Sequence, residues 1–182
     1  GRSYPVTINT LGKHNILNAL AAIAVGNHFG VPVETAVKQL MQFKGQRQSI
    51  RESNGYTVID DTYNASPDSM KASLSILDTM KGKNHKVAVL ADMLELGENS
   101  PLYHKEVGTY LADTSITDLF AVGDLIDHTI AEVKEKNPSV IVRKFDDNES
   151  LTAALQEFLQ PGDAVLLKGS NGMKLKEVAA AL

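Results

Sequence analysis

The sequence predicts an α/β fold with a mostly parallel sheet and helices on both faces. Short apolar segments alternate with longer segments whose apolar residues recur at helical spacing. Successive strands joined by helices favour parallel pairing through right-handed crossovers. Hydrophobic residues make up 43% of the 182 residues and charged residues 22%, close to the averages for globular proteins. We therefore expect a folded α/β chain.

The charge and the cysteine content exclude several classes of protein. Lys plus Arg is 18 and Asp plus Glu is 22, and no basic tract stands out, so we expect no nucleic-acid binding. The chain has no Cys, which excludes disulfides and thiolate metal sites and fits a reducing cytoplasm. No apolar run approaches the roughly 20 residues of a membrane span. We expect a cytoplasmic protein without a resident metal site.

The first part of the chain predicts a strand and then a helix. Residues 4–9 form the expected strand, and residues 15–29 carry apolar side chains at helical spacing. Asn15 is a candidate N-cap, and Gly30 suits the left-handed residue that ends a helix. The apolar face of this helix has few partners nearby in the sequence, so we expect it to dock elsewhere or to form an exposed patch.

A second helix is expected from about Pro32 to residue 41, because proline suits the first turn of a helix. Residues 44–48 are polar and contain a glycine, which places a domain boundary near residue 46. A hairpin should follow, because Asn54-Gly55 is a strong turn signal between residues 49–52 and 56–60.

Strands and helices then alternate to the end of the sequence. The expected strands are 57–60, 85–90, 118–122, 140–142 and 164–167, and the expected helices are 67–80, 102–112, 125–136, 148–159 and a last one that runs to residue 182. Three polar segments follow strands: 60–68, 92–95 and 168–172. Ligands of such sheets bind at the carboxyl ends of strands, so these segments are the candidate site.

Residues 60–69 read DDTYNASPDS and form the most informative segment. Ser66 can cap the next helix, with Pro67 at its first position. Helix capping does not account for Asp60, Asp61 and the following Tyr-Asn pair. A carboxylate at this place can bind ribose hydroxyls or a metal-bridged phosphate, although Asp pairs also occur in plain turns.

The other candidate residues each have a functional and a plain structural interpretation. Asn15 and Asn18 offer amide donors and acceptors for an adenine edge, or serve as a cap and a solvated helix residue. Asp92 and Glu95, with His104 nearby in sequence, suit a cation or an amine, or belong to a solvated loop.

Two further segments carry positive charge. Residues 168–172, which contain Lys168, Ser170 and Asn171, can present N–H groups to an anion, or form a tight turn. Arg47 is either a surface residue or a bidentate ligand for a phosphate. The sequence GxxxxGK[ST] of a P-loop occurs nowhere in the chain.

The order of these segments resembles the Mur ligases of peptidoglycan synthesis. The resemblance covers nearly the whole chain and rests on five segments: GKHNILNALAA at 12–22, GQR at 45–47, DDTYNASPDS at 60–69, DMLELG at 92–97 and KGSNGM at 168–173. It implies that residues 1–46 are the tail of a central ATP-binding domain. It implies that residues 47–182 are a Rossmann-like carboxyl-terminal domain.

The resemblance also implies a reaction and its participants. The expected enzyme is an ATP-dependent amide ligase that uses Mg²⁺ and adds D-alanyl-D-alanine to UDP-N-acetylmuramoyl-tripeptide through an acyl phosphate. An amino-terminal domain and the phosphate-binding loop, which this sequence lacks, would have to come from elsewhere in the protein, so the fragment alone is expected to be inactive. By similarity, the ATP-binding residues are Asn15, Asn18, Arg47, Asp61, Tyr63 and Asn64, and the dipeptide-binding residues are Asp92, Glu95, Lys168, Ser170 and Asn171.

Two other functions are compatible with the pattern. One is a stand-alone nucleotide- or amino-acid-binding module with a flavodoxin-like sheet. The other is a related ligase for a different amino acid or for polyglutamate, against which the Tyr63-Asn64-Ala65 segment argues.

Overall fold

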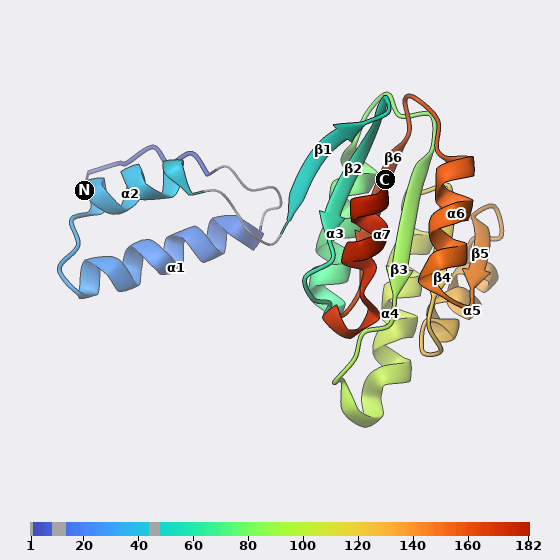
Figure 1. Ribbon diagram of the computed structural model, residues 1–182. Helices are drawn as coiled ribbons and strands as arrows, with labels where there is room; N and C mark the ends of the chain where they lie inside the picture. The colour runs from blue at the N-terminus through green and yellow to red at the C-terminus, as the bar shows by residue number, and fades with distance from the viewer. Residues whose placement is uncertain (1, 9–13, 44–47) are drawn as a thin grey trace. The chain divides into compact units, whose positions relative to one another are not determined.

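A computed structural model describes residues 2–8, 14–43 and 48–182. The chain divides into two compact units, residues 1–46 and 47–182, and each is described by itself. Figure 1 shows the helical first unit in blue and the layered second unit in the colours from cyan to red.

The first unit contains two helices, α1 (His14–His28) and α2 (Val33–Gln42). Gly30 has φ +84°, and the Val31 N–H donates to the Gly26 carbonyl, so a Schellman motif ends α1 as the sequence predicted. Several apolar side chains of this unit are exposed, as expected for a helix face without partners: Ile16, Leu17, Leu20, Val25 and Phe29.

The strand predicted at residues 4–9 is wrong for residues 4–8, and Asn9 lies outside the described residues. Residues 4–8 carry no strand assignment in the structure. The Tyr4 hydroxyl instead donates to the Glu34 carboxylate on α2, at 3.0 Å. An apolar alternation forms a strand only where another strand completes its hydrogen-bond ladder.

The second unit is built on a six-stranded sheet with the order β1-β2-β6-β3-β4-β5. Only β1 is antiparallel to its neighbour, and all the other pairs are parallel. The strands are β1 (Ser49–Ser53), β2 (Tyr56–Asp61), β3 (Lys86–Ala91), β4 (Asp118–Val122), β5 (Ile141–Phe145) and β6 (Ala164–Lys168). The predicted mostly parallel α/β sheet is therefore confirmed.

Helices cover both faces of this sheet (Figure 1). One core packs the sheet against α3 (Pro67–Thr79), α4 (Ser100–Ala112) and α5 (Asp127–Lys136). The other packs it against α6 (Asn148–Phe158) and α7 (Leu175–Ala181). Short 3₁₀ turns, η1 (Gly97–Asn99) and η2 (Asn171–Met173), precede α4 and α7. The central strands β3, β4 and β6 are almost wholly buried, which explains their continuous apolar sequences.

Strand β5 differs from the prediction, because it extends three residues beyond the expected end at residue 142. It is an edge strand, and polar Arg143 and Lys144 interrupt its apolar pattern. Arg143 is only partly buried, yet it has fixed partners. Its guanidinium lies 4.7 Å from the centre of the Phe158 ring and donates to Asp118 at 2.8 Å. Because charged residues occupy positions where a strand pattern requires apolar ones, the sequence does not show the full length of this strand.

A polar cluster joins three elements near the amino end of the parallel strands. The Asp78 carboxylate at the end of α3 accepts hydrogen bonds from the Ser115 hydroxyl at 2.6 Å and the Ser115 N–H at 2.8 Å. The Lys86 ammonium donates to the Ser115 hydroxyl oxygen at 2.7 Å. The Ser115 hydroxyl and then the Ser115 N–H make the largest contributions and lower the pKa of Asp78. Burial opposes them and raises this pKa, and the nearby Lys86 charge lowers it by a smaller amount than burial raises it.

This cluster predicts a pH-dependent stability difference for Ser115→Ala. A carboxyl whose pKa is lowered on folding stabilises the protein above its unfolded pKa, and the contribution disappears as the pH falls through the folded pKa. The variant should therefore melt at a lower temperature than the wild type at pH 7, and the gap should close below about pH 4. Thermal melts monitored by circular dichroism from pH 7 to pH 3 measure it. A gap of constant size across that range contradicts the prediction.

Candidate functional site

Three polar segments meet at the carboxyl ends of neighbouring strands. Strands β2, β6 and β3 lie next to one another and run parallel. The segments that follow them are 60–69, 168–173 and 92–97, the same three that the sequence singled out. The topology thus brings together residues separated by as many as 107 positions.

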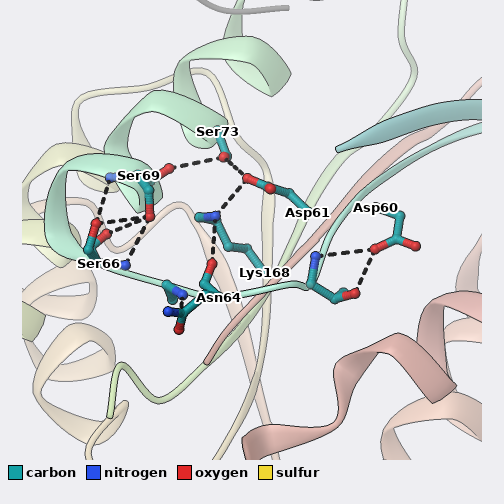
Figure 2. Close-up of polar contacts among 9 residues, drawn as sticks. Asp60, Asp61, Asn64, Ser66, Ser69, Ser73 and Lys168 are labelled. Carbon is teal, nitrogen blue, oxygen red and sulfur yellow. Dashed lines mark hydrogen bonds and ion pairs between the residues drawn. The ribbon is translucent and has the colours of Figure 1, made fainter. Parts of the chain in front are cut away.

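The centre of this arrangement is a buried ion pair between Lys168 and Asp61. The Lys168 ammonium lies 2.6 Å from Asp61 Oδ2, and its side chain is only 2% exposed. The same ammonium donates to the backbone carbonyl of Asn64 at 3.1 Å, and the Ser73 hydroxyl of α3 donates to Asp61 Oδ2. Figure 2 shows Lys168 between Asp61 and Asn64, with Ser73 and Lys168 at the same oxygen of the Asp61 carboxylate. Sequence analysis missed Ser73, which lies 12 residues from its partner and gives no local signal.

The rest of the 60–69 segment is held by local hydrogen bonds. Asp60 accepts from the Thr62 hydroxyl at 2.7 Å, and Ser66 caps α3 in a reciprocal pair with Ser69. The predicted capping role of Ser66 is therefore confirmed. Tyr63 is 55% exposed and Asn64 is also exposed, so both side chains are accessible to a ligand.

Ser170 joins the loop after β6 to the loop after β3. Its N–H donates to the Asp92 carbonyl at 3.0 Å, and its hydroxyl accepts from the Leu94 N–H at 2.8 Å. Its neighbour Gly169 packs so closely on Ala91 that an added Cβ would lie 2.7 Å from the Ala91 Cβ. Ser170 is buried, so it contributes to the shape of the site rather than to its surface.

Asp92 ties the end of β3 to the loop after β4. Its two carboxylate oxygens accept from the Ile126 N–H at 2.7 Å and the Asp124 N–H at 3.0 Å. The side chain is buried against Gly123, where an added Cβ would lie 2.5 Å from it. Both oxygens are thus engaged by backbone amides, whereas the sequence had suggested a carboxylate offered to a cation or an amine.

His104 holds the loop after β3, which begins at Asp92. The buried imidazole accepts the Met93 N–H at Nε2, at 3.1 Å, and Nδ1 lies 2.8 Å from the Ser100 carbonyl. This pattern assigns the proton to Nδ1 and leaves Nε2 as an acceptor. The predicted association of His104 with the Asp92–Glu95 segment is thus made through the backbone.

Glu95 and Asn171 are the candidate dipeptide residues with exposed side chains. Glu95 has φ +63°, a left-handed conformation that is uncommon for a residue other than glycine. Leu94, beside it, is 37% exposed and approaches Gly172, where an added Cβ would lie 2.9 Å from the Leu94 side chain. These exposed residues, Leu94, Glu95 and Asn171, are called the rim below, and they present an apolar group, a carboxylate and an amide.

The first unit holds Asn15 and Asn18, and the Asn18 amide donates to Asn15 Oδ1 at 3.1 Å. Asn15 lies within α1, which begins one residue earlier. Arg47 lies outside the described residues. Within the described ranges, no three His, Asp or Glu side chains are grouped as a metal site, and no helix is long and apolar enough to span a membrane.

The comparison with protein families decides what kind of domain this is. The family described as "Mur ligase, glutamate ligase domain" matches residues 46–171. The chain belongs to the Mur ligase family. This agrees with the resemblance carried by the five sequence segments.

Individual Mur ligases are similar over nearly the whole chain. The "UDP-N-acetylmuramoyl-tripeptide--D-alanyl-D-alanine ligase" of Bacillus subtilis (strain 168) is 40% identical over 96% of this chain, and that of Synechocystis is 34% identical over all of it. The chain spans about two fifths of the length of these relatives, 39% in both cases.

Solved structures of Mur ligases share the fold. A crystal structure of MurF from Acinetobacter baumannii superimposes with a TM-score of 0.82 at 30% identity, over 96% of this chain and 38% of that one. The MurF ligase of Thermotoga maritima in complex with ADP gives 0.79 at 28% identity, over 98% of this chain and 40% of that one.

The geometry predicts that Asp92 and Glu95 differ sharply in their effect on stability. Asp92→Ala leaves two backbone N–H groups without their acceptor, and Ile126 is fully buried, so we expect a loss of about 2–4 kcal/mol in the free energy of unfolding. Glu95→Gln changes an exposed side chain and should stay within about 0.5 kcal/mol of the wild type. Urea unfolding measures both values. Equal losses in the two variants contradict this assignment.

Proposed function

We propose that this chain is the carboxyl-terminal part of an ATP-dependent ligase that adds D-alanyl-D-alanine to UDP-N-acetylmuramoyl-tripeptide. The observation that carries the proposal is the 40% identity to such a ligase over 96% of the chain. The strand-end segments support it, because the polar residues that carry the resemblance come together at the carboxyl ends of β2, β6 and β3. The proposed place of the reaction is the cytoplasm, where ATP is available.

The proposed reaction proceeds in two steps. A carboxylate oxygen of the tripeptide attacks the γ-phosphorus of ATP, the bond to ADP breaks, and an acyl phosphate forms. The amine of D-alanyl-D-alanine, after losing a proton, attacks the acyl carbon and expels phosphate. Mg²⁺ would neutralise phosphoryl charge. The ion is proposed to be bound by the phosphates of ATP, and no three His, Asp or Glu side chains are grouped as a metal site in the described ranges.

Candidate nucleotide-binding residues are proposed for each unit by itself. In the first unit, Asn15 and Asn18 carry amides that suit the adenine edge. Arg47 is proposed to reach the ribose or the phosphates. In the second unit, Asp61 is the candidate for the ribose hydroxyls, and the exposed side chains of Tyr63 and Asn64 are proposed to line the nucleotide or dipeptide side. The Thermotoga maritima relative with ADP supports a nucleotide ligand.

The dipeptide is proposed to bind at the rim. D-Alanyl-D-alanine is a zwitterion with methyl side chains, so it needs an acceptor for its ammonium, donors for its carboxylate and an apolar contact. Glu95, the Asn171 amide and Leu94 offer these three properties. Asp92, Lys168 and Ser170 are buried, and we propose that they shape this site without contacting the dipeptide.

The proposal predicts activity for the natural full-length protein and none for residues 1–182 alone. The full-length protein with ATP, Mg²⁺, UDP-N-acetylmuramoyl-tripeptide and D-alanyl-D-alanine should release ADP and form the pentapeptide product, measured by coupled assay and mass spectrometry. Omitting the dipeptide is the control. Turnover by residues 1–182 alone, or glutamate used in preference to the dipeptide, contradicts the proposal. Tight ATP binding by this chain alone would instead favour a stand-alone nucleotide-binding module.

A second prediction concerns Glu95. Glu95→Gln removes the negative charge proposed to accept the dipeptide's ammonium and keeps the size of the side chain. We expect the KM for D-alanyl-D-alanine to rise about tenfold or more, since a charged hydrogen bond contributes about 1.5–3 kcal/mol. The KM for ATP should not change. Glu98→Gln, in the adjoining 3₁₀ turn η1 and also exposed, is the matched control. An unchanged dipeptide KM would remove Glu95 from the site.

A further inference from the structure

We propose that Lys168 is a positioning residue that holds the nucleotide side and the dipeptide side of the site in one fixed arrangement. The inference rests on the proposed function, since it names what the two sides bind. It concerns a side chain that the resemblance had placed among the dipeptide ligands. Its buried position assigns it a different role.

The surroundings of Lys168 exclude direct contact with a substrate carboxylate. The side chain is 2% exposed, and its ammonium already faces Asp61 Oδ2 at 2.6 Å and the Asn64 carbonyl at 3.1 Å. Because almost none of the side chain is exposed, a substrate carboxylate could reach the ammonium only if Asp61 or the Asn64 segment moved away, and this would weaken a buried charge pair. Removing one member of a buried charge pair is strongly unfavourable, so Lys168 acts through its protein partners.

Toward the nucleotide side, Lys168 fixes both ends of a short segment. Asp61 ends strand β2, and Asn64 follows it by three residues, so one ammonium holds the segment at two points. Tyr63 lies between them with an exposed side chain. Lys168 thus holds Asp61 and the Asn64 backbone in place, and with them the ends of the short segment between them (Figure 2).

Toward the dipeptide side, Lys168 acts through the chain that follows it. Gly169 is packed against Ala91 without room for a side chain. Ser170 then binds the Asp92 carbonyl and the Leu94 N–H. A shift at the end of β6 is therefore transmitted to the loop that carries Glu95. Ser73, in contrast, touches the Asp61 side chain and its own helix, and reaches only the nucleotide side.

Because Lys168 reaches both sides of the site and Ser73 reaches only one, substitutions at the two positions should change the KM values differently. Lys168→Met keeps the apolar stem and removes the charge, so the KM values for ATP and for D-alanyl-D-alanine should both rise about tenfold. Ser73→Ala removes one hydrogen bond to Asp61, so the KM for ATP should rise about threefold while the KM for the dipeptide stays constant. Lys71→Met, which breaks an ion pair between α3 and Glu106 of α4, is the matched control and should leave both values unchanged.

The kinetics should be measured on the natural full-length protein, with the melting temperature of each variant recorded beside them. A merely structural role would lower kcat per total enzyme and the melting temperature while both KM values stay constant, and this result would overturn the inference. A rise in the ATP KM alone for Lys168→Met would also overturn it, because the two sides would then be independent. A wild-type protein without the ligase activity would overturn the proposed function and the inference together, whereas the other two results leave that function intact.

Discussion

The arrangement of the strand-end segments depends on how the chain buries the charge of Lys168. Strand β6 lies between two parallel neighbours and is apolar up to its last residue, where an ammonium is withdrawn from water. Burying an unpaired charge costs several kcal/mol, so the neighbouring strand has to supply an anion at the same level. Asp61 is the register partner of Lys168 in the β2–β6 ladder, and the segment after it turns back so that Asn64 supplies a second acceptor. Helix α3 then begins at the Ser66 cap.

A second constraint on the strand-end segments comes from backbone N–H groups that are hydrogen-bonded to buried side chains. Asp92 satisfies two amides of the loop after β4, His104 satisfies one of the loop after β3, and Ser170 satisfies another. Buried polar groups with fixed partners resist small displacements, because each move leaves a donor or an acceptor unpaired. The exposed residues of the rim are therefore carried on a rigid support, which suits the proposed binding of the dipeptide.

Much of this architecture could be predicted from the sequence. The alternation of strands and helices, the Asn54-Gly55 hairpin and the Ser66 cap depend on local chemistry, which a few neighbouring residues contain. The roles of Asp92 and Ser170 could not be predicted in the same way, since their partners lie 32 and 76 residues away. A carboxylate after a strand has the same appearance in sequence whether it binds a ligand or two backbone amides. The strand expected near Tyr4 failed for a related reason, because local alternation says nothing about a partner strand.

The position of β6 in the sheet has a consequence for protein synthesis. The ribosome makes β2 and β3 early. Each of them has β6 as a neighbour in the sheet, and β6 is made after all the other strands. Until residues 164–168 have emerged, the two parts of the sheet, β1-β2 and β3-β4-β5, have no ladder that joins them. A nascent chain of this kind exposes open strand edges that favour aggregation. The sheet is therefore completed late in protein synthesis, and the ion pair between Lys168 and Asp61 forms at that stage.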